Sequence, residues 1–338
     1  MAFVPWFPDA ALGPRWVVLS LLIPFFIGTR QSLSLLLIAC TLSLGLIRSP
    51  VIWDGLYIYW HLLIFAACVL AAPVNMRPVY LGAGIGLALN GLLVAAQYWG
   101  GWYPFSEPIP NSGLFSNKNV GAEMAALVLV GLFGARLWGF VPFVAVPLVT
   151  QPLSRGAALA AGLAGVCAAW HRHRFATILA GIVLIGVIYH LAEVQGWGRR
   201  VFNVELRLTL WAEMLPAMCW WGNGLGSFIW AYPWMERAHN DFLQVAYELG
   251  LPGALLFLAF FGYCLWSGPL TERLVILAFL VAGCFGFPLY IPGTVFIAGL
   301  AAGSILRHRV PLFGWQRLRQ LAGDEGDRGR IPARARAV

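Results

Sequence analysis

The chain has 338 residues, of which 60% are hydrophobic and only 11% are charged, and its formal net charge is +8. Soluble domains carry about 25% charged residues, so this composition excludes a water-soluble globular protein. Long uncharged runs recur along the chain. They lack the apolar–polar alternation of barrel strands, and lipid otherwise admits only helices. We expect an all-α, polytopic helical membrane protein with about 10–12 transmembrane helices of roughly 20 residues each.

The predicted transmembrane spans follow the apolar runs in chain order. They lie at 15–28, 31–47, 51–72, 79–98, 119–135, 138–153, 156–170, 175–192, 251–267, 272–287 and 289–306. The runs 138–153 and 289–306 are short and contain prolines, so these helices are expected to be tilted, broken or fused with neighbours. One transmembrane domain, 1–306, and a basic tail, 307–338, are the predicted domains. The tail is expected to be disordered.

The basic residues set the predicted orientation. Eight arginines follow Leu306, which makes the tail cytoplasmic by the positive-inside rule. Counting spans backward then places segment 193–250 and the turns 99–118 and 154–155 on the outer side. The predicted location is the bacterial inner membrane, with any active site facing the periplasm. The positive charge is assigned to topology and not to nucleic-acid binding.

The outer segment 193–250 is rich in tryptophan and predicts two short helices. The tryptophans are Trp197, Trp211, Trp220, Trp221, Trp230 and Trp234. They suit either an interfacial aromatic belt or a stacking surface for sugar rings. One amphipathic helix is expected at 205–215, ended by Pro216, and glycines at 222–226 predict a tight turn. A second helix at 239–249 is expected to stop at Gly250.

Basic residues on the outer side need an explanation other than topology. Lys118 and Arg155 stand at the outer mouths of spans, Arg207 on the first short helix, and Arg237 just before His239. Each of them alone can snorkel to lipid headgroups. Their coincidence with Asn- and Gly-rich turns instead favours an anionic ligand, because guanidinium groups match phosphate oxygens bidentately.

His239 is the remaining polar candidate in the outer segment. An imidazole can accept a proton near neutral pH, while Asn240 beside it could either cap the short helix or bind a sugar hydroxyl. On spacing alone, a plain helix N-terminus with capping residues is the favoured interpretation of 238–241. Inside the predicted spans, Glu123, Asp54 and His61 are ionisable. Such residues suggest function, although near an interface they can simply reach water.

Signals for cofactors are missing from the sequence. It contains no Walker-type loop, no dinucleotide-binding glycine motif and no His/Cys cluster with metal-ligand spacing. The six cysteines are scattered and are expected to be small apolar residues. We therefore expect no metal and no other cofactor, and no nucleotide sugar as donor.

Four blocks occur together in a recognisable order. They are 113–119 (GLFSNKN), 154–157 (SRGA), 207–211 (RLTLW) with Pro216 and 222–228 (GNGLGSF), and 238–240 (AHN) running to 248–253 (ELGLPG). With the long outer loop, this series resembles the bacterial O-antigen ligase and O-antigen polymerase superfamily. The blocks span roughly the middle half of the chain. The chain is shorter than expected for that family, and its outer loop is compact.

The resemblance implies a metal-independent, inverting membrane glycosyltransferase. The donor would be an undecaprenyl-pyrophosphate-linked glycan, and the acceptor either lipid A–core, for a ligase, or a growing glycan, for a polymerase. Transfer onto a protein would use the same donor chemistry. Membrane lipids are the other expected partners. Two alternatives of a different class stay open: a transporter or flippase for a lipid-linked or anionic solute, and a non-catalytic scaffold.

The resemblance also implies roles for individual residues. Arg155 and Arg207 would bind the pyrophosphate, and His239 would act as general base on the acceptor hydroxyl or orient it. Further substrate-binding residues would be Asn117, Lys118, Asn119 and Asn240. Arg237 is added to this set because of its position just before the histidine.

Overall fold

The computed structural model describes residues 42, 47–50, 52–102, 113, 115, 118–150, 155–170, 202–235 and 237–309. Throughout these ranges the regular secondary structure is helical. The predicted spans at 15–28, 31–47 and 175–192 lie wholly or almost wholly outside the described residues, as does nearly all of the tail 307–338.

Every predicted span within the described residues is a helix. They are α3 (Ile52–Ala71), α4 (Arg77–Gly100), α5 (Lys118–Gly134), α6 (Val141–Val149), α7 (Arg155–Trp170), α11 (Asp241–Ser267), α12 (Leu270–Phe285) and α13 (Pro292–Arg309). Of these, α3, α4 and α11 are long and apolar enough to cross a membrane, while α5, α6 and α7 include shorter apolar stretches. The chain is a polytopic helical membrane protein, as the composition predicts.

Prolines explain the two short spans. A 3-10 turn, η1 (Trp138–Phe140), precedes α6, which contains Pro147 and ends at Val149. A second 3-10 turn, η3 (Pro288–Tyr290), precedes α13, which begins at Pro292. Proline has no N–H and is tolerated in the first turn of a helix, whereas it interrupts a helix interior. These spans are therefore broken where the sequence predicted.

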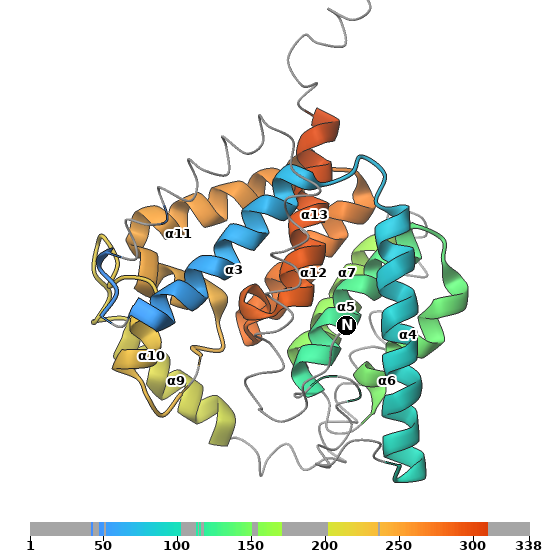
Figure 1. Ribbon diagram of the computed structural model, residues 1–338, viewed down its shortest axis with the longest axis horizontal. Coiled ribbons are helices and arrows are strands. Elements are labelled where there is room, and N and C mark those ends of the chain that lie inside the picture. The colour runs from blue at the N-terminus through green and yellow to red at the C-terminus, as the bar shows by residue number, and fades with distance from the viewer. Residues whose placement is uncertain are drawn as a thin grey trace, which may run out of the picture.

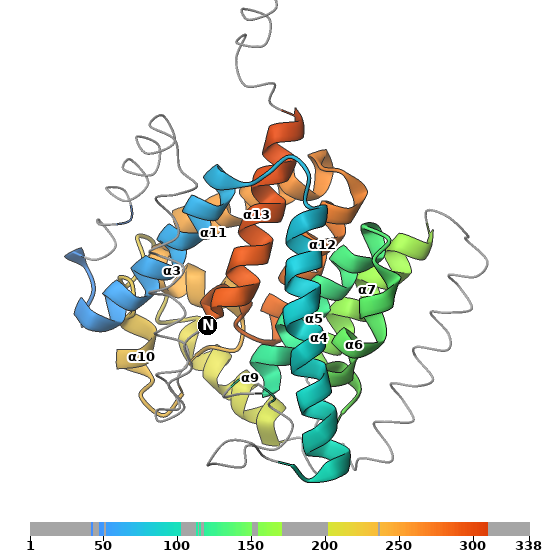
Figure 2. The ribbon, with the colours of Figure 1, turned by 45° about the vertical axis from the view of Figure 1, so that its right-hand side comes forward.

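Helix α12 occupies the centre of the described bundle (Figure 1, Figure 2). It packs against α5 and α7 on one side and against α11 and α13 on the other, while α3 packs on α13. Gly299 and Gly303, one turn apart on α13, allow the close approach of α3. A β-carbon at Gly303 would lie 2.1 Å from the Val69 carbonyl oxygen. Small residues at such spacing let helix backbones meet in membranes.

Residues 202–250 form a smaller unit with its own apolar cluster. It contains α9 (Phe202–Met214), α10 (Ser227–Ala231) and the first half of α11. Both short helices predicted for the outer segment are present. Their shared cluster is separate from the main core and consists of Leu210, Met214, Phe228, Tyr232, Ala238 and Tyr247. This cluster fixes α9 against the residues that precede α11.

The glycine turn locks this unit onto the break in α11. Gly222 has a φ of 77° and Gly250 a φ of 72°, a region that favours glycine. Their backbones are so close that a β-carbon at Gly250 would lie 2.4 Å from the Gly222 nitrogen. The Gly224 N–H also donates to the Glu248 carbonyl at 3.0 Å. The predicted helix end at Gly250 is confirmed, because the helical geometry is interrupted there before the long apolar half begins.

Candidate functional site

His239 has a backbone conformation that residues other than glycine rarely adopt. Its φ is 52°, a left-handed value that costs a non-glycine residue about 1–2 kcal/mol. Its neighbours hold it there: the Ala238 carbonyl accepts from Trp211 Nε1 at 2.8 Å, and the Ala238 N–H donates to Gln244 Oε1 at 3.1 Å. Strained backbone that is held in this way is common at functional sites.

Asn240 caps α11. Its Oδ1 accepts from the Leu243 N–H at 3.0 Å, and its Nδ2 donates to the Cys284 carbonyl at 3.4 Å. The capping alternative from the sequence is therefore confirmed. That Asn240 also contacts a sugar hydroxyl stays a prediction.

Arg207 joins the strained histidine from α9. It lies one helical turn from Trp211, so both side chains project from the same face of α9. Its Nη1 donates to the Phe285 carbonyl at 2.9 Å, and its Nη2 lies 3.4 Å from His239 Nδ1. Because a guanidinium can only donate, Nδ1 acts as the acceptor. The imidazole is therefore neutral, with its proton on Nε2.

The surroundings keep His239 uncharged. Burial, together with the positive charges of Arg207 and Arg237, lowers the pKa of His239 to about 4. Its ring also packs edge-on against Phe287, with the ring centroids 5.3 Å apart. At neutral pH the site therefore presents two guanidinium cations and one neutral imidazole.

The loop between α12 and α13 supports this arrangement, and sequence reasoning missed it. Phe285 supplies the carbonyl that holds Arg207, Phe287 packs on His239, and the Leu289 N–H donates to Asp241 Oδ2 at 2.8 Å. Gly286 and Pro288 are the only sequence signals here, and they indicate a turn without a function. Arg207 and Asp241 are bound here by backbone groups, which every residue type has, so the sequence does not reveal them.

Arg155 begins α7, directly before a close packing contact with the same loop. A β-carbon at Gly156 would lie 3.0 Å from Phe285 Cβ, so the first turn of α7 packs where the Phe285 carbonyl receives Arg207. The fold therefore brings the start of α7 against Phe285, whose carbonyl accepts from Arg207. The Arg155 side chain lies outside the described part of the structure.

The Asn/Lys block lies at the start of α5. Lys118 is the first residue of α5 and Asn119 the second, while Asn117 lies outside the described residues, as does the Lys118 side chain. Asn119 precedes the buried Glu123 by one turn, which places both on one helix face. Glu123 interacts electrostatically with Arg207. The start of α5 therefore borders the same region.

Arg237 stacks on aromatic rings. Its guanidinium carbon lies 4.9 Å from the ring centroid of Tyr290 and 5.4 Å from that of Tyr57 on α3. His61, also on α3, lies between these two residues, with its ring nitrogens 2.7 Å from the Tyr57 carbonyl and 3.1 Å from the Tyr290 carbonyl. Arg237 also interacts electrostatically with the buried Glu248. These contacts are all with groups of the protein itself, and a contact of Arg237 with substrate stays a prediction.

Three carboxyl groups are buried around the site: Glu123 on α5, and Asp241 and Glu248 on α11. Glu248 Oε1 accepts from Gln244 Nε2 at 3.0 Å, and the Glu248 carboxylate also accepts from the backbone N–H groups of Gly226 and Phe228. Sequence analysis singled out Glu123 as an ionisable residue within a span but took Asp241 and Glu248 only as helix residues. Their burial depends on packing between helices distant in the sequence.

Four of the outer tryptophans are exposed, namely Trp220, Trp221, Trp230 and Trp234. Trp211 is instead half-buried and holds the Ala238 carbonyl. Trp197 lies outside the described residues. Exposure suits both an aromatic belt and a sugar-stacking surface, so both alternatives stay open for these four residues.

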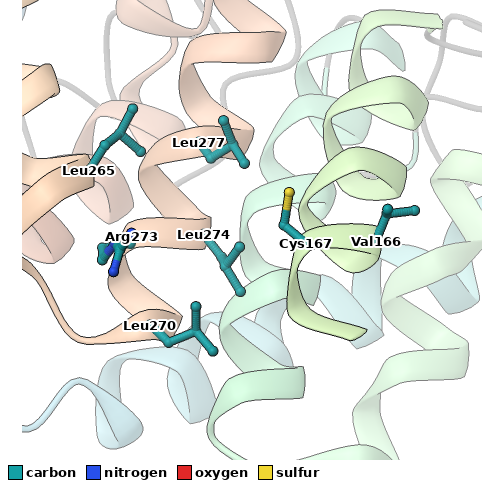
Figure 3. Close-up of a pocket in the computed structure, with 7 residues that line it drawn as sticks. All are labelled: Val166, Cys167, Leu265, Leu270, Arg273, Leu274 and Leu277. Carbon is teal, nitrogen blue, oxygen red and sulfur yellow. The ribbon is translucent and has the colours of Figure 1, made fainter. Parts of the chain in front are cut away.

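A pocket of about 380 Å³ lies elsewhere, between α7, the end of α11 and the first half of α12 (Figure 3). Its lining is apolar apart from Arg273. It lies toward the opposite end of α12 from Phe285 and does not contain the arginine–histidine arrangement. In the described part of the chain, no group of three His, Cys, Asp or Glu side chains could hold a metal ion.

Comparison with known proteins gives two weak likenesses, and no family model matches the chain. The probable peptidoglycan glycosyltransferase FtsW of Halothiobacillus neapolitanus is 24% identical over 277 residues, which are 72% of this chain and 61% of that protein. The protein of the same name from Hahella chejuensis is 41% identical over 56 residues, 16% of this chain and 14% of that protein. The chain thus spans about three-fifths of the length of the first relative.

Proposed function

We propose that this protein is a glycosyltransferase of the bacterial inner membrane. It moves a glycan from an undecaprenyl-pyrophosphate carrier to an acceptor hydroxyl at the periplasmic face, without a metal or a nucleotide. The observation that carries this proposal is the pairing of Arg207 with His239 at 3.4 Å, next to Phe285, against which the start of α7 packs. The glycosyltransferase names of the two relatives support the reaction class.

Arg207 is suited to binding the diphosphate of the carrier. In the described geometry its Nη2 donates to a neutral ring nitrogen, whereas a diphosphate offers ionised oxygens that a guanidinium can bind bidentately. A diphosphate would therefore take this donor from His239. Arg155, at the start of α7, supplies the second guanidinium. Both cations stabilise the charge that grows on the diphosphate as the glycosidic bond breaks.

His239 takes the proton of the acceptor. When a diphosphate draws Arg207 away, Nδ1 becomes free, and the added negative charge favours a protonated imidazole. The acceptor oxygen attacks the anomeric carbon, the bond from that carbon to the diphosphate oxygen breaks, and the hydroxyl proton passes to Nδ1. A single displacement inverts the anomeric centre. The base is thus made competent by the donor itself.

The remaining predicted residues border this reaction. Asn117, Lys118 and Asn119 at the entrance to α5 line the cavity that holds the glycan. Asn240 fixes the start of α11 and, with Arg237, keeps its predicted place next to the substrate. These roles rest on the resemblance and on position.

The acceptor is proposed to be lipid A–core, as in an O-antigen ligase. A second candidate is a polymerase whose acceptor is a growing glycan, and the names of both relatives favour it, because they describe peptidoglycan glycosyltransferases. The donor chemistry is the same for both candidates. The acceptor distinguishes them.

A reconstituted reaction tests the proposal. Purified protein in proteoliposomes is given an undecaprenyl-pyrophosphate-linked glycan together with either lipid A–core or a second lipid-linked glycan. Glycosylated lipid A–core is expected for a ligase and lengthened lipid-linked glycan for a polymerase. Movement of the donor between leaflets without any new glycosidic bond would contradict the proposal and indicate a flippase.

Deleting the gene gives an independent measurement in cells. For a ligase, capped lipopolysaccharide should disappear from gels while lipid-linked polymer accumulates. For a polymerase, products with a single repeat unit are expected instead. An unchanged envelope glycan pattern would count against both candidates.

A further inference from the structure

Two buried carboxyl groups lie near the Arg207–His239 pairing, and each has an oxygen without a hydrogen-bond partner among the described residues. Glu123 is 3% exposed and Asp241 is 2% exposed. Within the described part of the chain, Glu123 Oε2 and Asp241 Oδ1 are buried without a hydrogen bond. The two groups interact electrostatically with each other. Buried carboxylates normally need full pairing, so these two oxygens require a ligand.

The last turn of α12 provides the space for both groups. A β-carbon at Gly286 would lie 2.2 Å from Glu123 Oε1, and one at Gly283 would lie 3.4 Å from Asp241 Oδ2. Any larger side chain at Gly286 would displace the Glu123 carboxyl. This end of α12 also carries the negative end of the helix dipole. Two ionised carboxylates are therefore disfavoured here, both by their mutual repulsion and by the helix dipole.

Among the described residues, the cations that interact with the two acids also have other partners. Two cations face them within the described residues, Arg207 from α9 and Arg237 from the segment before α11. Arg207 donates to the Phe285 carbonyl and pairs with His239, while Arg237 also interacts electrostatically with Glu248. The other titratable groups around them are His239, His61 on α3, Cys284 on α12 and Tyr290 on η3.

A proton held by one of the two acids removes the repulsion between them. A protonated carboxyl has a single O–H to donate to a carboxylate, and such a hydrogen bond between the two groups would satisfy the free oxygen on each residue. We propose that Glu123 and Asp241 form a proton-binding pair that shares one proton and, resting on the function proposed above, sets the affinity of Arg207 for a diphosphate. We call these two residues the carboxyl pair.

The link to the diphosphate is electrostatic. Arg207 interacts with Glu123 and, as proposed, with the donor. When the carboxyl pair loses its proton, the added negative charge holds Arg207 and repels the incoming anion. Diphosphate binding and proton binding by the carboxyl pair therefore strengthen each other, and linkage requires this in both directions.

Binding of a lipid diphosphate at several pH values tests the inference. Undecaprenyl pyrophosphate is titrated into full-length protein in detergent between pH 7 and pH 9.5, for the wild type, Glu123→Gln and Asp241→Asn. In the wild type, Kd is expected to rise by up to about tenfold per pH unit as the carboxyl pair loses its proton. In Glu123→Gln and Asp241→Asn the rise should be much smaller than in the wild type and the control, less than about twofold per pH unit.

Glu213→Gln is the matched control. Glu213 is an exposed acid on α9, the helix that carries Arg207, so this variant removes one negative charge without touching the carboxyl pair. It should keep the wild-type pH dependence, which also accounts for ionisation of the ligand. An identical pH dependence in Glu123→Gln and the wild type would overturn the inference.

Infrared spectroscopy gives a readout that does not depend on the function. At pH 7 the wild type should show the C=O band of a buried protonated carboxylic acid, and Glu123→Gln and Asp241→Asn should each lose it. Absence of this band in the wild type would overturn the inference even if glycan transfer is found. Conversely, a band that is present in protein that neither binds lipid diphosphate nor transfers glycan would sink the proposed function and leave the carboxyl pair standing.

Discussion

The two arginines of the site, Arg207 and Arg237, have different surroundings. On one side, the half-buried Arg207 donates to the Phe285 carbonyl, pairs with the neutral imidazole of His239 and interacts electrostatically with Glu123. On the other side, Arg237 lies over two tyrosine rings and close to buried carboxyl groups. The sequence offers both as equivalent outer-side arginines. Their surroundings make the first suited to exchanging partners and the second suited to holding helices together.

This difference follows from the groups around each guanidinium. Arg237 offsets the charge of buried acids, and a cation in such a place is costly to remove. Arg207 forms hydrogen bonds with acceptors that are weaker than phosphate, so a ligand anion can replace them. Three predictions test whether the first arginine is functional and the second structural.

The largest effect is expected for Arg207. Arg207→Ala should lower the rate of glycan transfer by about 10²–10³-fold, the usual cost of removing one group that stabilises developing charge. Arg207→Lys should recover little, because an ammonium cannot replace the planar fork. The rate is measured with purified protein and lipid-linked donor. Arg77→Ala, which removes an exposed arginine at the start of α4, is the control and should stay within about twofold of the wild type.

Replacing Arg237 should lower the stability of the protein more than it lowers the rate of glycan transfer. Arg237→Ala leaves Asp241 and Glu248 without their shared cation and should lower the free energy of unfolding by about 3 kcal/mol. Arg237→Lys should cost less, because the charge remains. Thermal unfolding in detergent gives the comparison. If Arg237→Ala unfolds like the wild type but transfers no glycan, Arg237 contacts substrate and the contrast with Arg207 disappears.

The pH dependence of transfer should show the smallest effect. The pKa of His239 is lowered to about 4, so the neutral base is present above that pH and is lost as the pH falls through it. We expect the acid side of kcat/KM to be flat down to about pH 5 and to fall about tenfold per unit below pH 4. The profile of kcat should turn down at a higher pH, because the bound diphosphate favours the protonated ring. Equal acid limbs in both profiles would contradict activation of His239 by the donor.

How far the site could be predicted depends on the kind of contact involved. Arg207 and His239 could be predicted from residue type and block order, and the two side chains do meet. The α12–α13 loop could not, because Phe285 and Leu289 contribute backbone groups, which every residue has. Asp241 was hidden for another reason: a helix N-terminus ordinarily carries an acid, so nothing in the sequence distinguished it from a capping residue.

The sequence by itself determined the helices, because a chain this apolar must satisfy its backbone within each segment. It also determined the breaks at Gly250 and Pro292, since glycine and proline act on the local backbone. Only the tertiary structure decided which arginine faces histidine and which faces tyrosine, and that Glu123 and Asp241 are neighbours. Those relations join α5, α9, α11 and α12 across more than a hundred residues, and the packing distances that fix them leave no local pattern in the chain.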